Sequence, residues 1–270
     1  MIQVQNLSKQ FSGQTLFEDV SFNMQPGERI GLVGRNGSGK STLFKMILGE
    51  MTSDSGEVVI PKNYKLGKLE QHISFSKKSV IEECSQVLTE EERFDFYKAE
   101  KILTGLGFSD EDFEKDPRSF SGGFQIRINL CKSLLTKPNL LLLDEPTNYL
   151  DILSLRWLRR FLRTFDGEVI LITHDRSFMD SVTTHTMGIY RQGLKKIKGN
   201  THKFYEQLEI EDEIYQKTKE NQDRKRAHLE SFVDRFAAKA SKATQAQSKM
   251  KQLAKMGQMD DLSFCLLYTS

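Results

Sequence analysis

Long apolar runs are missing from this sequence: the longest is five residues, Phe264 to Tyr268. A membrane-spanning helix needs about 20 apolar residues, so no segment is a candidate for crossing a bilayer. Cysteine is also scarce, with three widely separated residues, Cys84, Cys131 and Cys265. An odd number without metal-type spacing argues against a disulfide framework or a zinc site. We therefore expect a cytoplasmic protein with free thiols and no membrane partner.

A strong overall charge is absent as well. The 39 Lys and Arg residues nearly balance 37 Asp and Glu residues, which leaves a net charge of +2. This balance hides a local excess, because residues 217–256 hold eleven basic and four acidic side chains, whereas residues 1–216 carry a net charge of −3. The basic character therefore belongs to one segment of the chain.

What the sequence does contain is a complete phosphate loop. Residues 34–41 read Gly-Arg-Asn-Gly-Ser-Gly-Lys-Ser, the G-x-x-x-x-G-K-S pattern. Its glycines let backbone N–H groups turn toward phosphate oxygens at a helix N-terminus. Lys40 would neutralise the β and γ phosphates, and the Ser41 hydroxyl would ligate Mg²⁺. The predicted nucleotide-binding residues of this loop are Gly34, Asn36, Gly37, Ser38, Gly39, Lys40, Ser41 and Thr42.

A second motif is the run of four leucines at 140–143, which ends in Asp144-Glu145. A carboxylate at Asp144 can hold Mg²⁺ through its water shell. Glu145 can polarise an attacking water as the general base of phosphoryl transfer. His174 follows the apolar run 169–172 and is predicted to contact the γ-phosphate. A pair of surface acids and a structural histidine are the alternative interpretations of these residues.

The continuous apolar runs 140–143 and 169–172 predict strands that are covered on both faces in a parallel sheet, and residues 29–33 predict a further buried strand. Helical sequence separates the two continuous runs, so a right-handed crossover and an α/β fold are expected. Short strands are predicted at 2–7 and 56–60. Residues 79–120 show helical periodicity, which indicates a helical subdomain over about 79–138. The apolar positions that carry this periodicity are Phe94, Tyr97, Ile102, Leu103 and Leu106.

From about Tyr205 the sequence predicts one long, polar helix. A narrow apolar stripe recurs at three- and four-residue steps. Its members are Leu229, Phe232, Val233, Phe236, Ala240 and Ala243. Residues 235–256 then hold six Lys or Arg and no acid, a composition that attracts RNA phosphates, with a solvated coiled-coil face as the alternative. The predicted RNA-binding residues are Arg235, Lys239, Lys242, Lys249 and Lys251.

In their order along the chain, these motifs resemble the ATP-binding cassette superfamily over roughly residues 1–200. Ser121-Gly122-Gly123 then corresponds to the signature motif. The resemblance implies a P-loop NTPase cassette with a small antiparallel β subdomain and a helical subdomain, and ATP and Mg²⁺ as ligands. It also implies that Ser121, Gly122 and Gly123 grip the γ-phosphate of ATP bound to an opposite cassette. The implied domains are a cassette at 1–204, a basic helical linker at 205–256, and an irregular end at 257–270 that is a candidate for non-native sequence.

The resemblance assigns roles to three further residues. Gln71 would sense Mg²⁺ and the attacking water, which makes it both a catalytic and a metal-site residue. Phe11 would stack on adenine, with a core phenylalanine as the alternative. Asp151, which ends the sequence Glu-Pro-Thr-Asn-Tyr-Leu-Asp, would reach across the dimer seam.

Within the superfamily, two features are similar to the ABC-F proteins, the soluble, translation-associated branch. Residues 145–151 match its E-P-T-N-x-L-D form, and residues 232–249 closely resemble its interdomain linker. The family linker joins two cassettes and reaches toward ribosome-bound tRNA. The resemblance therefore implies the ribosome, tRNA and a second cassette, in cis or in trans, as partners. This sequence ends soon after the linker, so a second cassette lies outside it.

The leading hypothesis is an ABC-F ATPase that acts on the ribosome and that turns over slowly as a single cassette. One alternative is the ATPase subunit of a membrane transporter, against which the basic linker and the E-P-T-N form argue. Another is a binding-only switch that rarely hydrolyses ATP. Glu145 argues for hydrolysis, because a switch needs no general base.

Overall fold

The computed structural model describes residues 1–11, 13–69, 74–92, 94–236 and 243–255. The chain separates into two compact units, Met1–Phe204 and Tyr205–Ser270. Among the described residues, no helix has the length and apolar character needed to cross a bilayer.

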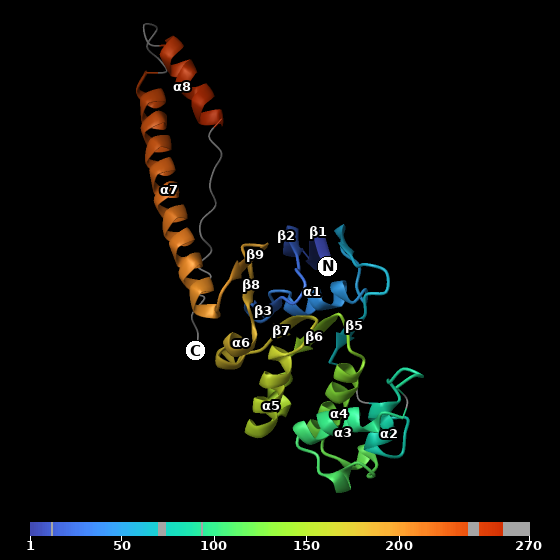
Figure 1. The fold of residues 1–270 in the computed structure, drawn as a ribbon. Coiled ribbons are helices and arrows are strands. Elements are labelled where there is room, and N and C mark those ends of the chain that lie inside the picture. The colour runs from blue at the N-terminus through green and yellow to red at the C-terminus, as the bar shows by residue number, and fades with distance from the viewer. Residues whose placement is uncertain (12, 70–73, 93, 237–242, 256–270) are drawn as a thin grey trace. The chain divides into compact units, whose positions relative to one another are not determined.

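A six-stranded sheet with the order β5-β6-β7-β3-β8-β9 forms the centre of the first unit (Figure 1). Its strands are β3 (Arg29–Val33), β5 (Leu66–Lys68), β6 (Leu140–Asp144), β7 (Glu168–Ile172), β8 (His185–Tyr190) and β9 (Gly193–Lys198). All neighbouring strands are parallel except β8 and β9. The register pairs Asp144 with Ile172, so the carboxyl ends of β6 and β7 lie level.

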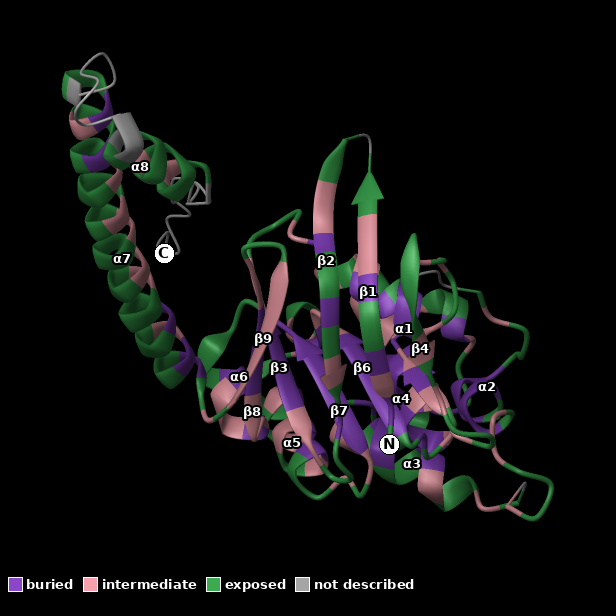
Figure 2. Ribbon diagram, turned by 90° about the horizontal axis from the view of Figure 1, so that it is seen from above, coloured by how far each residue is buried: buried purple, intermediate pink, exposed green. Residues whose placement is uncertain are grey.

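The apolar strands are buried on both faces, as their sequence predicts. Leu141 and Leu143 of β6 belong to a core shared with the helices, whereas Leu140 and Leu142 belong to a second core on the opposite face. Figure 2 shows β6 and β7 in the buried colour along their length. Continuous burial explains why these strands read as unbroken apolar runs instead of alternating ones.

A three-stranded antiparallel sheet, in the order β2-β1-β4, shares the second core with α1. Its strands are β1 (Gln3–Phe11), β2 (Gln14–Asn23) and β4 (Ser55–Val59), and α1 spans Lys40–Ile47. The predicted antiparallel β subdomain is therefore confirmed.

Helices cover the other face of the large sheet. They are α2 (Val80–Ser85), α3 (Phe96–Gly105), α4 (Gly122–Leu135), α5 (Ile152–Arg163) and α6 (Arg176–Val182), with short 3₁₀ turns η1 (Asp110–Asp112), η2 (Pro117–Ser119) and η3 (Pro146–Tyr149). The predicted helical subdomain is present, but the apolar positions that indicated it are not all buried. Ile102, Leu103 and Leu106 are buried, but Phe94 and Tyr97 are 73% and 60% exposed. These two rings therefore do not belong to the core.

The second unit contains most of α7 (Thr201–Phe236) and all of α8 (Ala243–Lys255). Leu229 and Val233 of the predicted stripe are buried on α7, and α8 lies beside the last part of α7 (Figure 1). The described part of the linker is therefore two helices, where the sequence predicted one. The side chains of Phe236, Ala240 and Ala243, and the whole of residues 257–270, lie outside the described residues.

Candidate nucleotide-binding site

The phosphate loop connects β3 to α1, and its glycines are required by its shape. Gly39 has φ of 98°, and a Cβ there would lie 2.6 Å from the ring of Phe17. Gly34 has φ of 153°, and a Cβ there would lie 2.7 Å from the Ser38 hydroxyl oxygen. Larger residues would therefore be strained by the backbone angle and would also clash with neighbouring side chains.

The loop borders a cavity of about 310 Å³. The residues that line it are Asn36, Gly37, Gly39, Lys40, Ser41, Thr42, Asp144, Glu145, Ile172 and His174. Two motifs separated by about a hundred residues in the sequence meet here, because β3 and β6 both flank β7 and present their carboxyl ends at the same edge. Ligands of open α/β sheets bind at this edge.

Lys40 is held inside the loop. Its Nζ donates hydrogen bonds to the carbonyl oxygens of Gly34 and Arg35, at 2.6 and 2.9 Å. Burial lowers the pKa of Lys40, although the nearby carboxylates of Asp144 and Glu145 act to raise it. An ammonium group that is satisfied only by two neutral carbonyls is well suited to exchange them for phosphate oxygens.

Ser41 and Asp144 form the part of the cavity that fits a cation. The Ser41 hydroxyl donates to Asp144 Oδ2 at 3.0 Å, which places two hard oxygen ligands side by side. Among the described residues, no cluster of three His, Cys, Asp or Glu side chains offers a complete metal site. A Mg²⁺ ion here would therefore take its other ligands from phosphate and water, as this ion commonly does.

Glu145 and His174 face one another at the ends of β6 and β7. Glu145 has a left-handed backbone with φ of 50°, and its N–H donates to the carbonyl of Ile172 at 2.9 Å. The His174 N–H donates to Glu145 Oε2 at 3.3 Å, and His174 Nε2 lies 3.4 Å from Oε1. The strained backbone and these contacts hold the carboxylate at the cavity wall, whereas the His174 side chain is 73% exposed.

The signature residues lie outside this cavity. Ser121 is the N-cap of α4, and no side-chain capping bond occupies its hydroxyl. Gly122 and Gly123 have no left-handed backbone, and a Cβ on either would meet nothing within 4 Å. Nothing in this chain's own described packing therefore requires glycine at these two positions.

Two other predicted residues, Phe11 and Asp151, are not among the residues that line the cavity. Phe11 is 41% exposed at the end of β1, where the Lys9 ammonium lies 5.3 Å from its ring centroid. Asp151 is the N-cap of α5, and its Oδ1 accepts a hydrogen bond from the Ser154 N–H at 2.8 Å. Gln71 lies outside the described residues. The proposed adenine, dimer-seam and water-sensing roles of these residues stay predictions.

Arg127 is a residue of the site region whose role the sequence did not reveal. It is 8% exposed, and it donates to the carbonyls of Leu106 and Tyr149, both at 2.9 Å, and to Asp151 Oδ2 at 3.0 Å. It thus joins the signature helix α4 to the turn that follows Glu145. The pKa of Asp151 lies below its usual range. The hydrogen bond from the Ser154 N–H is the largest cause, and the Arg127 guanidinium contributes further.

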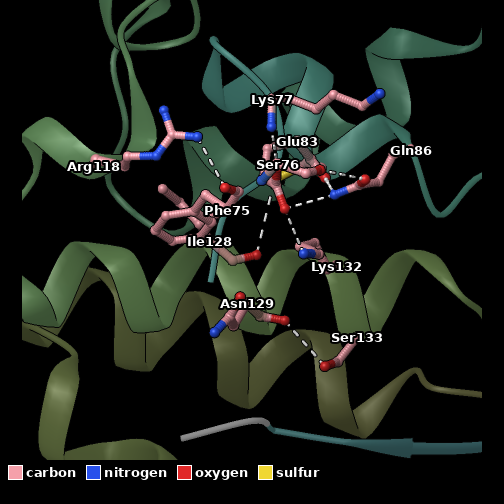
Figure 3. A network of polar contacts seen from close by, with 11 residues as sticks. Phe75, Ser76, Lys77, Glu83, Gln86, Arg118, Ile128, Asn129, Lys132 and Ser133 are labelled. Atoms are coloured by element: carbon pink, nitrogen blue, oxygen red, sulfur yellow. Dashed lines mark hydrogen bonds and ion pairs between the residues drawn. The ribbon is translucent and has the colours of Figure 1, made fainter. Parts of the chain in front are cut away.

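Lys68, which precedes Gln71 in the sequence, and Ser76 and Lys77, which follow it, are held by contacts to α2 and α4. On one side, the Ser133 hydroxyl of α4 donates to the Lys68 carbonyl at 2.6 Å. On the other, the N–H groups of Ser76 and Lys77 both donate to Glu83 Oε2 at 2.9 Å (Figure 3). Lys132 of α4 completes this network by donating to Glu83 Oε1 at 2.6 Å. Lys68 is therefore joined to the signature helix α4 directly, and Ser76 and Lys77 are joined to it through Glu83.

The ion pair between Glu83 and Lys132 gives a first prediction. Burial would raise the pKa of Glu83, but Lys132 and the two backbone N–H groups outweigh burial and hold this pKa below its usual range. Glu83 is 1% exposed, so Lys132→Met leaves a buried carboxylate without its counterion. We expect the free energy of unfolding to fall by about 3 kcal/mol at neutral pH, measured by urea denaturation.

The matched control is Lys137→Met, which removes an ammonium that is 65% exposed from a pair with Glu92. Its expected cost is under about 1 kcal/mol. Because the pKa of folded Glu83 is depressed, its contribution to stability is present above the pKa of an unfolded glutamate and is lost as the pH falls through the lower folded pKa. The two variants should therefore converge on acidification, and equal stabilities at neutral pH would contradict this role for the pair.

Of the predicted RNA-binding residues, Arg235 and Lys251 are exposed and Lys249 is half-buried. Lys239 and Lys242 lie outside the described residues. Ion pairs at i, i+4 spacing, such as Lys217 with Glu213 at 3.7 Å, join residues of the earlier part of α7. The basic excess is therefore concentrated toward the end of the linker, where acids are absent from the sequence.

Comparison with known proteins gives the family. Two family models, both described as ABC transporter, match residues 17–148 and 187–263. The ATP-binding protein YdiF of Bacillus subtilis is 35% identical, over 96% of this chain and 47% of its own length. The ATP-binding cassette sub-family F member 3 of Rattus norvegicus is 30% identical, over 96% of this chain and 41% of its own length. The chain thus spans about half the length of these curated relatives.

Solved structures agree on the fold. The dimeric post-hydrolysis structure of the ATP-binding cassette MJ0796 bound to ADP and Pi has a TM-score of 0.60 and 21% identity, and it covers 73% of this chain and 98% of its own. The predicted α/β cassette with antiparallel and helical subdomains and a long helical linker is confirmed. The chain belongs to the ATP-binding cassette superfamily, and its relatives include members of the ABC-F branch.

Proposed function

We propose that this chain binds Mg·ATP at the phosphate loop and hydrolyses it to ADP and phosphate when a second cassette closes over the nucleotide. The observation that carries this proposal is the convergence of Lys40, the Ser41–Asp144 pair and Glu145 on one cavity. A volume of about 310 Å³ is at the small end of ligand pockets. A cavity of this size can hold the phosphates of a nucleotide, and the rest of the nucleotide would then be covered by a second protein domain.

The signature motif supports a second cassette as that body. Ser121 opens α4, a helix of 14 residues whose N-terminal dipole favours a phosphate. The open space at Gly122 and Gly123 allows a close approach from outside this chain. The solved relative MJ0796 is itself dimeric. We infer that Ser121, Gly122 and Gly123 contact ATP bound to an opposite cassette.

Each residue of the cavity then has a distinct task. Lys40 leaves the carbonyls of Gly34 and Arg35 and binds phosphate oxygens. Glu145 accepts a proton from the attacking water, and His174 contacts the γ-phosphate from the exposed side of the cavity. A bound Mg²⁺, held by Ser41 and Asp144, would neutralise charge on the phosphates.

Replacing Lys40 by Ala tests nucleotide binding directly. Two charge-assisted hydrogen bonds to phosphate are worth about 1.5–3 kcal/mol each, so ATP affinity should fall by about 100-fold or more. Lys45→Ala is the matched control, because Lys45 is exposed on the same helix and does not line the cavity. Calorimetric titration with Mg·ATP measures both. Unchanged affinity of Lys40→Ala would refute the assignment of the phosphate loop.

Hydrolysis by the isolated chain should depend on its concentration. If each complete site needs Lys40 of one copy and Ser121 of another, the turnover per molecule rises as copies meet, and it stays low when the protein is dilute. Turnover that is brisk and independent of protein concentration would show that one cassette suffices.

We further propose that the protein acts on the ribosome as an ABC-F factor in the cytoplasm, with the basic linker meeting ribosomal RNA or tRNA. The sub-family F relative, the E-P-T-N form at 145–148 and the basic excess near the end of the linker support this proposal. Co-sedimentation of the chain with ribosomes in ATP tests it. Association with membranes instead of ribosomes would favour a transporter ATPase.

A further inference from the structure

The first unit contains a second, larger cavity, which is lined by none of the nucleotide-binding residues. Its volume is about 800 Å³, and we call it the α3–α5 groove. Its walls come from α3, the end of α4, the end of α5 and the turns that precede β6 and β7. The ATP site uses the carboxyl ends of β6 and β7, so the groove lies at the opposite ends of these strands. No residue lines both cavities.

Aromatic side chains of α5 form one wall. Trp157, Phe161 and Phe165 form a ladder, with centroids 5.3 and 6.0 Å apart and planes inclined by 25° and 31°. All three are only partly buried. Neighbouring rings face one another, and two glycines lie close to the ends of the ladder: a Cβ on Gly105 would lie 2.1 Å from Trp157, and one on Gly167 would lie 2.6 Å from Phe165.

The orientation of the ladder decides which ligand suits the groove. Nucleobases bind aromatic residues by stacking on open ring faces, and here the sides on which neighbouring rings face one another are taken up within the ladder. Ring edges carry partial positive charge, so they accept apolar groups and carboxylates. The 60% exposed ring of Tyr97 adds aromatic surface from α3. These features favour an apolar protein segment over RNA.

Charge adds a second requirement. Two of the lysines that line the groove are neutralised: Lys98 pairs with Glu92 and Asp95, at 2.9 and 2.6 Å, and Lys137 pairs with Glu92 at 2.7 Å. Lys101 of α3 and Arg160 of α5 make no ion pair with any residue in the described part of the chain. Asp166 is the one acidic side chain among the residues that line the groove. The groove therefore presents two positively charged side chains, one on α3 and one on α5, that can pair with carboxylates of a ligand.

We propose that the α3–α5 groove binds a protein partner through a segment that carries an apolar or aromatic anchor beside carboxylates. Trp, Tyr and Arg dominate the binding energy of protein interfaces, and Trp157, Tyr97 and Arg160 all line this groove. The anchor enters between α3 and α5, and its carboxylates pair with Lys101 and Arg160. Ser121 and Asp151 are the N-caps of α4 and α5, and both helices end at the groove. The partner therefore contacts the two helices that follow the signature serine and the turn after Glu145.

The test uses the full chain and two sets of short synthetic peptides with the same Phe- and Leu-containing core. One set has flanking Asp residues, and the other has flanking Lys residues. Fluorescence anisotropy should show binding of the acidic set only. The double variant Lys101→Glu/Arg160→Glu should lose at least about tenfold in affinity for the acidic set and gain affinity for the basic set. Arg163→Glu, an exposed change on α5 outside the groove, should bind like the unmodified chain.

Retained Mg·ATP affinity in every variant shows that the fold is intact. Tyr97→Ser tests the aromatic wall at an exposed position that cannot unfold the core, and it should also weaken binding of the acidic set. Equal binding of both peptide sets, no binding of either, or no effect of the charge reversal would overturn the proposal. Binding of a single-stranded oligonucleotide that is lost in the double variant would overturn it in favour of RNA.

Discussion

Replacing Glu145 by Gln is expected to slow ATP hydrolysis by about 10²–10⁴-fold while leaving ATP binding unchanged, because the amide cannot accept the proton of the attacking water. The substitution preserves the local structure. The amide oxygen can still accept the hydrogen bond from the His174 N–H, and the left-handed backbone at φ of 50° is unaffected. Phosphate release in single-turnover experiments measures the rate. Glu57→Gln, an exposed change on β4, is the control.

The same variant should also trap a dimer. If ATP is sandwiched between two cassettes and persists, copies of Glu145→Gln should associate in ATP and not in ADP, as measured by light scattering. Adding Gly122→Asp places a carboxylate against the γ-phosphate of the opposite site. A Cβ at Gly122 meets no neighbour, so the chain should still fold and bind ATP. A dimer that survives this second change would contradict the role of the signature.

The parts of the site that sequence reasoning found are those built from contiguous residues. The phosphate loop and the Asp144-Glu145 strand end each follow local rules, because glycine geometry and double-sided burial leave direct traces in the sequence. Their meeting at one cavity follows from the parallel order of β3, β7 and β6. A general rule about the carboxyl ends of parallel strands predicts such a meeting.

The residues that sequence reasoning missed act through tertiary contacts. Glu83 and Lys132 are 49 residues apart, and nothing in either neighbourhood shows that they form a buried pair. Arg127 looks like one more polar residue of a helix, although its partners come from α3, η3 and α5. Tyr97 has helical periodicity and a large apolar ring, and it is nevertheless exposed beside a groove. Periodicity identifies a helix face without showing what covers it.

The linker provides the second large expected effect. Changing Arg235, Lys239, Lys242, Lys249 and Lys251 to Gln should weaken ribosome binding and flatten its dependence on salt. Each lost phosphate contact should reduce the slope of log affinity against log salt by about 0.7–0.9. The loss of five contacts should therefore lower the affinity for ribosomes by orders of magnitude at physiological salt. Co-sedimentation with ribosomes over a salt series, with ATP present, measures the slope.

Two controls separate RNA contact from stability. A variant with five exposed cassette lysines changed to Gln carries the same loss of charge outside the linker: Lys45, Lys62, Lys65, Lys78 and Lys203. It should keep the original slope.

Leu229→Ala removes a side chain that is 4% exposed on α7, so it should cost about 2–5 kcal/mol of stability in the second unit without changing the slope. Mg·ATP affinity should be the same in all of these variants, because the phosphate loop is untouched. If the linker variant bound ribosomes normally at every salt concentration, the basic run would be a solvated helix face, and the ribosomal proposal would lose its main physical support.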